Sequence, residues 1–130
     1  MKKIIILIPV YNDWESLEKL IKEINENIKT FKDINFECLI VNDASTIKPP
    51  ELKKLSNFSS IELLNMRENR GHARCNAFGI RYVFKNKDFD NLILMDGDGE
   101  DRPEEIKSLV EKIKENPNLS VVAKRVKRSE

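Results

Sequence analysis

The chain has 130 residues, of which 35% are charged and 40% are hydrophobic, the balance of a single well-solvated globular domain. Basic side chains number 23 and acidic ones 22, so no overall charge would draw the chain onto nucleic acid or an anionic membrane. No apolar run approaches the ~20 residues of a membrane span, and the N-terminal run has no small-residue cleavage site. We therefore expect neither a membrane helix nor a signal peptide. The two cysteines, Cys38 and Cys75, form no CxxC pair, which argues against a zinc site or disulfide framework and favours the cytoplasm.

The first half of the chain predicts three strands and a long helix. The isoleucine-rich run at residues 3–8 is typical of a strand that is buried on both faces, as in a parallel sheet. Further strands are predicted at residues 36–41 and 61–66, and Pro49 with Pro50 predicts a short helix that continues to about residue 55. The long helix between the first two strands has one apolar stripe, formed by Leu17, Leu20, Ile21, Ile24 and Ile28.

The second half continues this alternation of helices and strands. A helix is predicted at residues 72–84, a strand at 91–95, a helix that begins near Pro103 and ends at Asn116, and a last strand at 119–123 before a charged tail. The apolar stripe of the first of these helices consists of Ala73, Ala77, Ile80 and Phe84. The apolar face of the second consists of Ile106, Leu109, Val110 and Ile113.

Strands that alternate with helices in this way indicate an α/β fold, with a mostly parallel sheet of about five strands flanked by helices. We expect a single domain over residues 1–130. Open parallel sheets bind ligands outside the carboxyl ends of their strands, so the residues that follow each strand are candidates for a site. In chain order these are Pro9, Tyr11, Asn12 and Asp13; Asn42, Asp43 and Ser45; Asn69, Arg70, Gly71 and His72; Asp96, Asp98, Glu100 and Asp101; and Arg125.

The acidic segment after the fourth strand is the most informative feature. Asp96, Asp98 and Glu100 alternate along the chain, so in an extended segment their carboxylates share one side. Mg²⁺ and Mn²⁺ prefer oxygen ligands, and the intervening glycines let the backbone approach a ligand closely. The alternative is an acidic turn that caps the helix at Pro103, with Asp101 as the cap. A cap needs no row of acids, so a metal site is favoured, although the spacing does not fit an EF-hand.

Four other side chains each have a functional and a structural interpretation. Asp43 accepts a hydrogen bond from a base or ribose, or closes an Asx-turn, and the sequence does not choose between these. Tyr11 stacks on a ring or packs under a loop, and core packing is favoured. Arg125 holds a phosphate or is a solvated charge in a basic tail, and the second is favoured. His72 is a general base or a helix-start residue bonded to a neighbour, and the second is favoured.

Several nucleotide-binding and signalling classes lack their motifs here. Neither GxGxxG nor the Walker pattern is present, which argues against a dinucleotide oxidoreductase and a P-loop kinase. A response-regulator receiver would need acids directly after the first and third strands, and this chain has none there. A nucleotidyltransferase ranks last, because the segment after the first strand has neither the glycines nor the bases that would cradle a triphosphate.

Taken together, five segments resemble the family 2 glycosyltransferases of the GT-A fold. Residues 8–13 look like the first-strand motif of that family, and residues 41–45 look like its second-strand motif with the first acid replaced by asparagine. Residues 69–72 resemble the NxGH segment of its polyprenyl-phosphate branch, and residues 95–104 its DXD-containing metal motif. Residues 123–125 align with a strand-five arginine. The resemblance spans the chain in the right order and implies a Rossmann-like nucleotide-binding half.

The resemblance implies a role for each residue of the nucleotide pocket. Pro9, Tyr11 and Asp13 would line the pocket, Asp43 would bind the base, and Ser45 would support the turn beside it. The donor would be a nucleotide diphosphate sugar of the UDP or GDP type. Its acceptor would be a lipid such as a polyprenyl phosphate.

The resemblance also implies a metal site. Asp96 and Asp98, with Glu100, would hold Mg²⁺ or Mn²⁺ on the diphosphate of the donor, which Asp96 would also contact. The metal would neutralise the departing diphosphate as a Lewis acid. Arg125 would touch a phosphate of donor or acceptor.

Length is the main departure from the family, whose catalytic domains run to roughly two hundred residues or more, beyond the typical domain of ~100–150. We expect the acceptor-side elements and the general base to lie outside this chain, which would be a fragment or a shortened relative. A second copy or a partner would cover the face left open. The location would be cytoplasmic, peripheral to the inner face of the membrane. The alternative is a catalytically silent module that binds nucleotide or docks a partner.

Overall fold

The computed structural model describes residues 1–96 and 102–116, together with the backbone of residues 121–123. The elements follow in the order β1 (Lys2–Val10), α1 (Trp14–Asn27), β2 (Ile34–Asn42), β3 (Ser60–Asn65), α2 (His72–Asn86), β4 (Asn91–Leu94), α3 (Glu105–Glu115) and β5 (Val121–Ala123). In this part of the chain, no helix has the length and apolar character that crossing a membrane requires.

The five strands form one parallel sheet in the order β3-β2-β1-β4-β5, so the α/β fold predicted from the sequence is confirmed. β1 lies at the centre and pairs with β2 along its whole length, from Lys2↔Ile34 to Val10↔Asn42. On its other side it pairs with β4, from Ile4↔Asn91 to Leu7↔Leu94. The chain thus builds one side of the sheet and then crosses to the other. Such a reversal of strand order is where open α/β sheets bind ligands.

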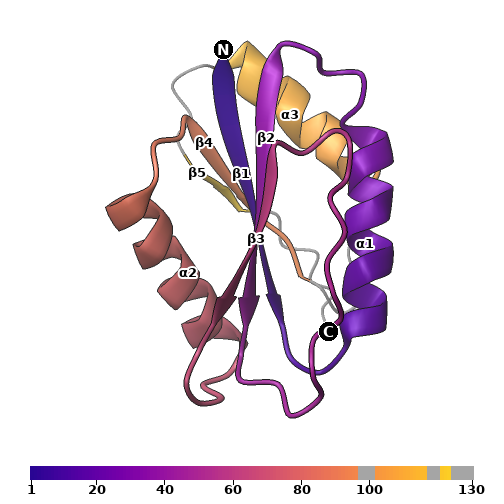
Figure 1. Cartoon of the computed structure of the whole chain (residues 1–130). Helices are drawn as coiled ribbons and strands as arrows, with labels where there is room; N and C mark the ends of the chain where they lie inside the picture. The colour runs from indigo at the N-terminus through magenta and orange to yellow at the C-terminus, as the bar shows by residue number, and fades with distance from the viewer. Residues whose placement is uncertain (97–101, 117–120, 124–130) are drawn as a thin grey trace, which may run out of the picture.

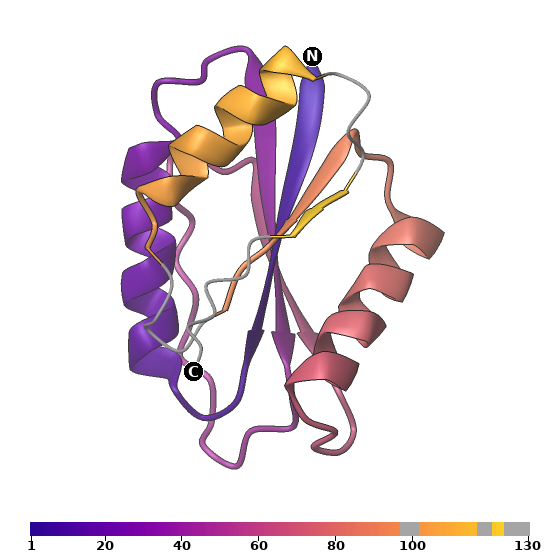
Figure 2. The same ribbon diagram turned by 180° about the vertical axis from the view of Figure 1, so that it is seen from behind.

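Helices cover both faces of this sheet, as the two opposite views in Figures 1 and 2 show. α1 and α3 lie on one face and α2 lies on the other. β1 supplies both cores, because alternate side chains of a strand point to opposite faces. Ile4, Ile6 and Ile8 pack with α1 and α3, whereas Ile5 and Leu7 pack with α2. The prediction that this strand is buried on both faces is confirmed.

The connection from β2 to β3, residues 43–59, contains no helix, so the short helix predicted after Pro50 is wrong. A proline disfavours helical backbone in the residue before it, and too few residues follow to sustain a helix alone. The connection is instead held from its far end, where Phe58 is buried in the same core as α1. The side-chain Oδ1 of Asn25 in α1 accepts a hydrogen bond from the Asn57 backbone N–H at 2.9 Å. The backbone carbonyl of Asn25 accepts a second bond from the Asn57 side-chain amide at 2.8 Å.

The apolar stripe predicted for α2 is also wrong, except at Ile80, which is partly buried and packs against the core on that face of the sheet. The prediction named Ala73, Ala77, Ile80 and Phe84. The buried residues are Cys75, Gly79 and Val83, and the side chain of Phe84 is 58% exposed. Small residues face the sheet because α2 lies close to it: a Cβ atom on Gly79 would stand 2.7 Å from Leu7 Cδ1. Part of the predicted stripe is therefore left on the outer side of the helix.

Candidate functional site

A pocket of about 280 Å³ opens at the carboxyl ends of β1 and β2, beside the first turn of α2. It lies at the edge of the sheet where the sequence predicts a ligand. Four residues assigned to substrate binding from the sequence line it, namely Pro9, Tyr11, Asp13 and Asp43. The rest of the lining consists of Val10, Asn69, Gly71, His72 and Cys75.

Two of the predicted residues stand in the segment that joins β1 to α1. Tyr11 is 48% exposed, so the interpretation that its ring packs in the core is wrong. Asp13 caps α1, and its carboxylate accepts a hydrogen bond from the Ser16 backbone N–H at 3.3 Å. An acid at this position satisfies a free N–H group and suits the positive end of the helix dipole. The pocket therefore has an exposed ring and a carboxylate on one wall.

Asp43 is buried, and its carboxylate holds the loop that precedes α2. Oδ1 accepts a hydrogen bond from the Arg70 backbone N–H at 2.9 Å, and Oδ2 accepts bonds from the Gly71 N–H and the Asn69 amide, both at 3.0 Å. The Asp43 N–H in turn donates to the Val10 carbonyl at 2.9 Å. Aligned backbone N–H groups stabilise an anion, and such bonds are about twice as strong as neutral ones. The carboxylate thus tethers distant segments rather than closing a local turn.

Asn42, which stands where the family motif usually has an acid, is buried as well. Its side-chain amide donates to Asn65 Oδ1 at 2.9 Å, and its own Oδ1 accepts a bond from the Ser45 backbone N–H at 3.0 Å. A carboxylate at this position would have no N–H group to give to Asn65. The departure from the motif is therefore compatible with the geometry, because the amide joins the ends of β2 and β3.

Asn12 connects the segment after β1 to the segment after β2. Its backbone has φ 65°, in the left-handed region that asparagine tolerates better than most residues. Its Oδ1 accepts bonds from the N–H groups of Thr46 at 2.8 Å and Ile47 at 2.9 Å, and its own N–H donates to Ser45 Oγ at 2.8 Å. The indole N–H of Trp14 donates to the Ile47 carbonyl at 2.9 Å. Ser45 thus contacts the backbone of this connection and is not part of the pocket lining.

His72 and Asp96 face each other at the edge of the pocket. His72 Nε2 lies 2.5 Å from Asp96 Oδ1, and the two side chains are 53% and 28% exposed. His72 is the first residue of α2, and Asp96 follows β4, so this contact joins two elements that pack on different parts of the sheet. The expectation that His72 is bonded to a neighbour is confirmed. That the neighbour is the first predicted metal ligand was not foreseen.

The other predicted metal ligands and the phosphate contact cannot be placed in this site. Asp98, Glu100 and Arg125 lie outside the described residues. Within the described part of the chain, no group of three histidine, cysteine or acidic side chains is close enough to hold a metal ion. Asp96 fits a divalent cation in its chemistry, since it offers a partly exposed carboxylate beside the pocket.

Two further lining residues have structural roles: Gly71, a candidate from the sequence, and Cys75, which the sequence analysis did not assign to the site. Gly71 has φ 90°, a conformation that side chains disfavour, and it places the turn that starts α2. Cys75 is buried, and its thiol donates to the Val41 carbonyl at 3.5 Å. Burial, together with the nearby Asp43 carboxylate, raises the pKa of Cys75 to about 12. The thiol is therefore neutral at physiological pH, which argues against a nucleophilic role.

Comparison with known proteins gives one family and several relatives. The family model for glycosyl transferase family 2 matches residues 5–130. A dolichol-phosphate mannosyltransferase of Pyrococcus furiosus is 28% identical over 126 residues, which cover 96% of this chain and 34% of the relative. An uncharacterised glycosyltransferase of Synechocystis is 32% identical over 129 residues, covering 96% of this chain and 38% of that protein.

A third relative is named as a transferase of a different sugar. An undecaprenyl-phosphate 4-deoxy-4-formamido-L-arabinose transferase of Salmonella choleraesuis is 32% identical over 116 residues, which cover 88% of this chain and 35% of the relative. The chain spans about a third of the length of these curated relatives.

Proposed function

The chain belongs to glycosyltransferase family 2, and on that premise we propose that it binds a nucleotide diphosphate sugar as the donor side of a sugar transfer. The observation that carries the proposal is the pocket lined by Pro9, Tyr11, Asp13 and Asp43, with Asp96 at its edge. We propose a polyprenyl phosphate as acceptor, because the names of two relatives specify dolichol phosphate and undecaprenyl phosphate.

The proposed donor site uses the groups that the pocket leaves available. The exposed ring of Tyr11 offers a stacking surface for a base. A carboxylate can accept about four hydrogen bonds, and the three bonds from the loop leave Asp43 Oδ1 able to accept one more from a base or ribose. Ser45 and Asn12 support this site from outside by fixing the segments after β1 and β2.

The proposed metal site centres on Asp96, with Asp98 and Glu100 as further oxygen ligands and Mg²⁺ or Mn²⁺ as the ion. The bound ion supplies charge neutralisation for the departing diphosphate. His72 holds the Asp96 carboxylate in place through its ring nitrogen, as residues behind metal ligands commonly do. Arg125 contacts a phosphate of donor or acceptor.

We further propose that this chain alone binds donor and metal but transfers sugar poorly. Support comes from its length, about a third of that of its relatives, which leaves room in them for acceptor-side groups and a general base. A cytoplasmic location is proposed from the two buried free thiols, Cys38 and Cys75.

Fluorescence of Trp14 tests the donor proposal, because this buried indole follows Asp13 directly and bonds to Ile47. We would titrate the chain with UDP and GDP, with and without Mn²⁺. The expected result is saturable binding of one nucleotide that requires the metal. Asp96→Asn should abolish the metal-dependent binding of the nucleotide, because it removes the charge of the metal ligand while keeping a group that can bond to His72.

The matched control is Glu111→Gln, which removes one exposed carboxylate from α3. It should bind as the unmodified chain does. A folded chain that binds neither nucleotide would refute the proposal. Binding that Asp96→Asn leaves unchanged would refute the metal site alone, and ordinary sugar transfer by the isolated chain would refute the proposed incompleteness.

A further inference from the structure

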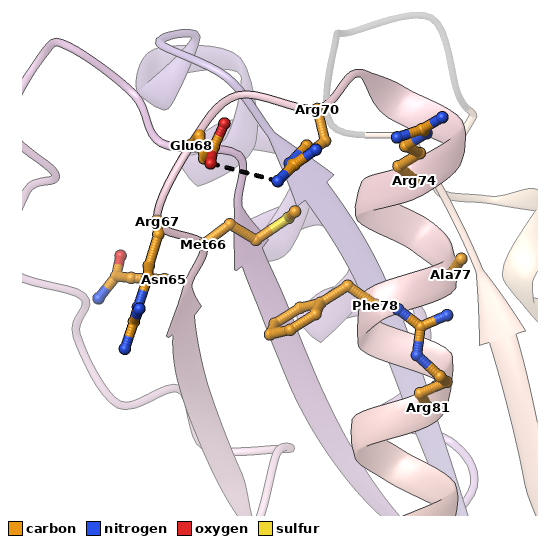
Figure 3. A pocket seen from close by; sticks show the side chains of 9 residues that line it. All are labelled: Asn65, Met66, Arg67, Glu68, Arg70, Arg74, Ala77, Phe78 and Arg81. Carbon is orange, nitrogen blue, oxygen red and sulfur yellow. Dashed lines mark ion pairs between the residues drawn. The ribbon is translucent and has the colours of Figure 1, made fainter.

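A second and larger hollow lies on the other side of the loop that precedes α2. Its volume is about 750 Å³, and it lies between the carboxyl end of the edge strand β3 and the outer side of α2. Figure 3 shows Met66 and Phe78 in its floor, with Phe78 projecting from α2 toward the end of β3. Four arginines line it, and we call it the arginine groove: Arg67, Arg70, Arg74 and Arg81.

The charges of the arginine groove are poorly balanced by the protein itself. Glu68 is the one acid in its lining, and it pairs with Arg70 at 3.2 Å. Among the described residues, Arg67, Arg74 and Arg81 make no ion pair. All four arginines are exposed. The lining therefore carries a net charge of +3 in a chain whose total is +1, which makes the positive charge a local feature. Guanidinium groups arranged in this way suit phosphate, which they bind through paired N–H donors.

The outer surface of α2 extends this pattern along the helix. Arg74, Arg81 and Lys85 have the i, i+7, i+11 spacing of one helical stripe, and all three are exposed. One exposed aromatic ring lies beside it, that of Phe84, which is 58% exposed, and the half-buried Ala77 lies two turns earlier on the same side of the helix. Basic side chains next to an exposed apolar one are typical of helices that lie in a membrane interface.

We propose that the arginine groove and the outer side of α2 dock this domain on the phosphate headgroups of an anionic membrane. The guanidinium groups bind lipid phosphates, and the Phe84 ring enters the boundary between headgroups and acyl chains. A balanced total charge excludes attraction of the whole molecule but not of this one face, whose charges act within a Debye length of the surface.

A soluble polyanion is the competing occupant, and the apolar part of this surface argues against it. A free phosphate compound would use the guanidinium groups but would leave Phe84 in water, whereas a lipid surface uses both. Loop 69–71 relates the two sites, since Arg70 lines the groove while Asn69 and Gly71 line the donor pocket. Docking through this face places the donor pocket beside the lipid. The proposal does not depend on the donor proposal, because it uses other residues.

Flotation with lipid vesicles tests the docking face directly. The chain, without nucleotide or metal, is mixed with phosphatidylcholine vesicles that contain or lack phosphatidylglycerol. It should bind only the anionic vesicles, and raising the salt from about 0.1 M to about 1 M should release it, as the Debye length falls from ~10 Å to ~3 Å. Arg74→Gln with Arg81→Gln should weaken partitioning by about fivefold for each arginine removed.

Two further variants separate the parts of this proposal. Lys107→Gln with Lys112→Gln removes two exposed charges from α3, on the other face of the sheet, and should bind anionic vesicles nearly as well as the unmodified chain. Phe84→Ser keeps the charge and should weaken binding through lost insertion. Absence of binding to anionic vesicles, or an equal loss in the α3 pair, overturns the proposal. Titration with pyrophosphate covers the competing occupant: pyrophosphate binding that Arg74→Gln with Arg81→Gln removes, without vesicle binding, also overturns it.

Discussion

The donor pocket and the arginine groove lie on opposite sides of the loop between β3 and α2. The charged side chains of the pocket have hydrogen-bond partners within the protein, whereas most of those of the groove do not. In the pocket, the Asp43 carboxylate receives three hydrogen bonds from that loop, and Asp96 is held by His72. In the groove, three of the four arginines have no partner in the described structure, and only Arg70 has an acid beside it. The same loop therefore has one side whose charges are satisfied internally and one side whose charges face solvent.

This difference separates the polar groups that stabilise the fold from those that are free to bind a ligand. Buried charges are costly unless they are hydrogen-bonded, so the groups around Asp43 contribute to folding as well as to the pocket. Exposed arginines contribute little to folding and keep their capacity for a ligand. Stability measurements and binding measurements should therefore separate the two sides of the loop.

The largest effect is expected from Asp43→Ala, which removes the acceptor of three N–H groups. Leaving those donors without partners should lower the free energy of unfolding by about 3 kcal/mol. Urea denaturation followed by circular dichroism measures this loss. Asp88→Ala, which removes an exposed carboxylate from the loop after α2, is the control and should change stability by less than about 0.5 kcal/mol. Equal effects of the two substitutions would contradict the anchoring role of Asp43.

A smaller effect is expected at the other end of α2, where a lysine is paired. Lys87 lies 2.8 Å from Glu62 and 3.7 Å from Glu37, and the Tyr82 hydroxyl donates to Glu62. Partial burial raises the pKa of Glu62, but the hydrogen bonds from Lys87 and Tyr82 outweigh it and lower the pKa overall. The pKa of Lys87 is raised, chiefly by its hydrogen bond to Glu62.

These shifts give a pH dependence with a definite sign. The Glu62 contribution is complete above the pKa of an unfolded glutamate, about 4.3, and is lost as the pH falls below that value through the lowered folded pKa. Lys87→Met should make the free energy of unfolding fall less steeply as the pH drops below this value. The difference from the unmodified chain should be less than about 1 kcal/mol, because the Lys87–Glu62 pair is partly exposed. An unchanged acid limb in chemical denaturation would contradict this pairing.

The smallest effect is expected from Arg74→Gln with Arg81→Gln. Because neither arginine has an ion pair in the described structure, their loss should change the free energy of unfolding by less than about 0.5 kcal/mol. The same urea denaturation measures it. A loss comparable to that of Asp43→Ala would show that these arginines are held by the fold, and the contrast between pocket and groove would disappear.

The order of elements was predictable from the sequence because hydrophobic periodicity records burial directly. The isoleucines of β1 and the stripe of α1 are long and unambiguous, and the structure buries them as predicted. For α2, two stripes compete at helical spacing, and the wrong one contains the larger apolar side chains. Close approach to the sheet selects small residues such as Gly79, and that distance is a tertiary property with no local signature.

The candidate site was predictable in its position but not in its contacts. Parallel topology indicates that residues after the strands gather at one edge, and Pro9, Tyr11, Asp13 and Asp43 do gather there. Topology could also have paired His72 with Asp96, since the start of α2 and the end of β4 share that edge. The bonds of Asn12 to residues 45–47 required a left-handed backbone that the sequence only permits. Asp98, Glu100 and Arg125 remain predictions.

The central position of β1 has a consequence for synthesis of the protein. β1 is made before both of its partners, which follow at different times: β2 begins at Ile34, whereas β4 begins only at Asn91. The edge of β1 that pairs with β4 therefore has no partner strand until Asn91 and the residues after it have been translated. Pairings of high sequence separation form slowly, and open strand edges of this kind invite aggregation. A nascent chain that has β1 and β2 but not yet β4 is therefore expected to be more prone to aggregation than the folded sheet.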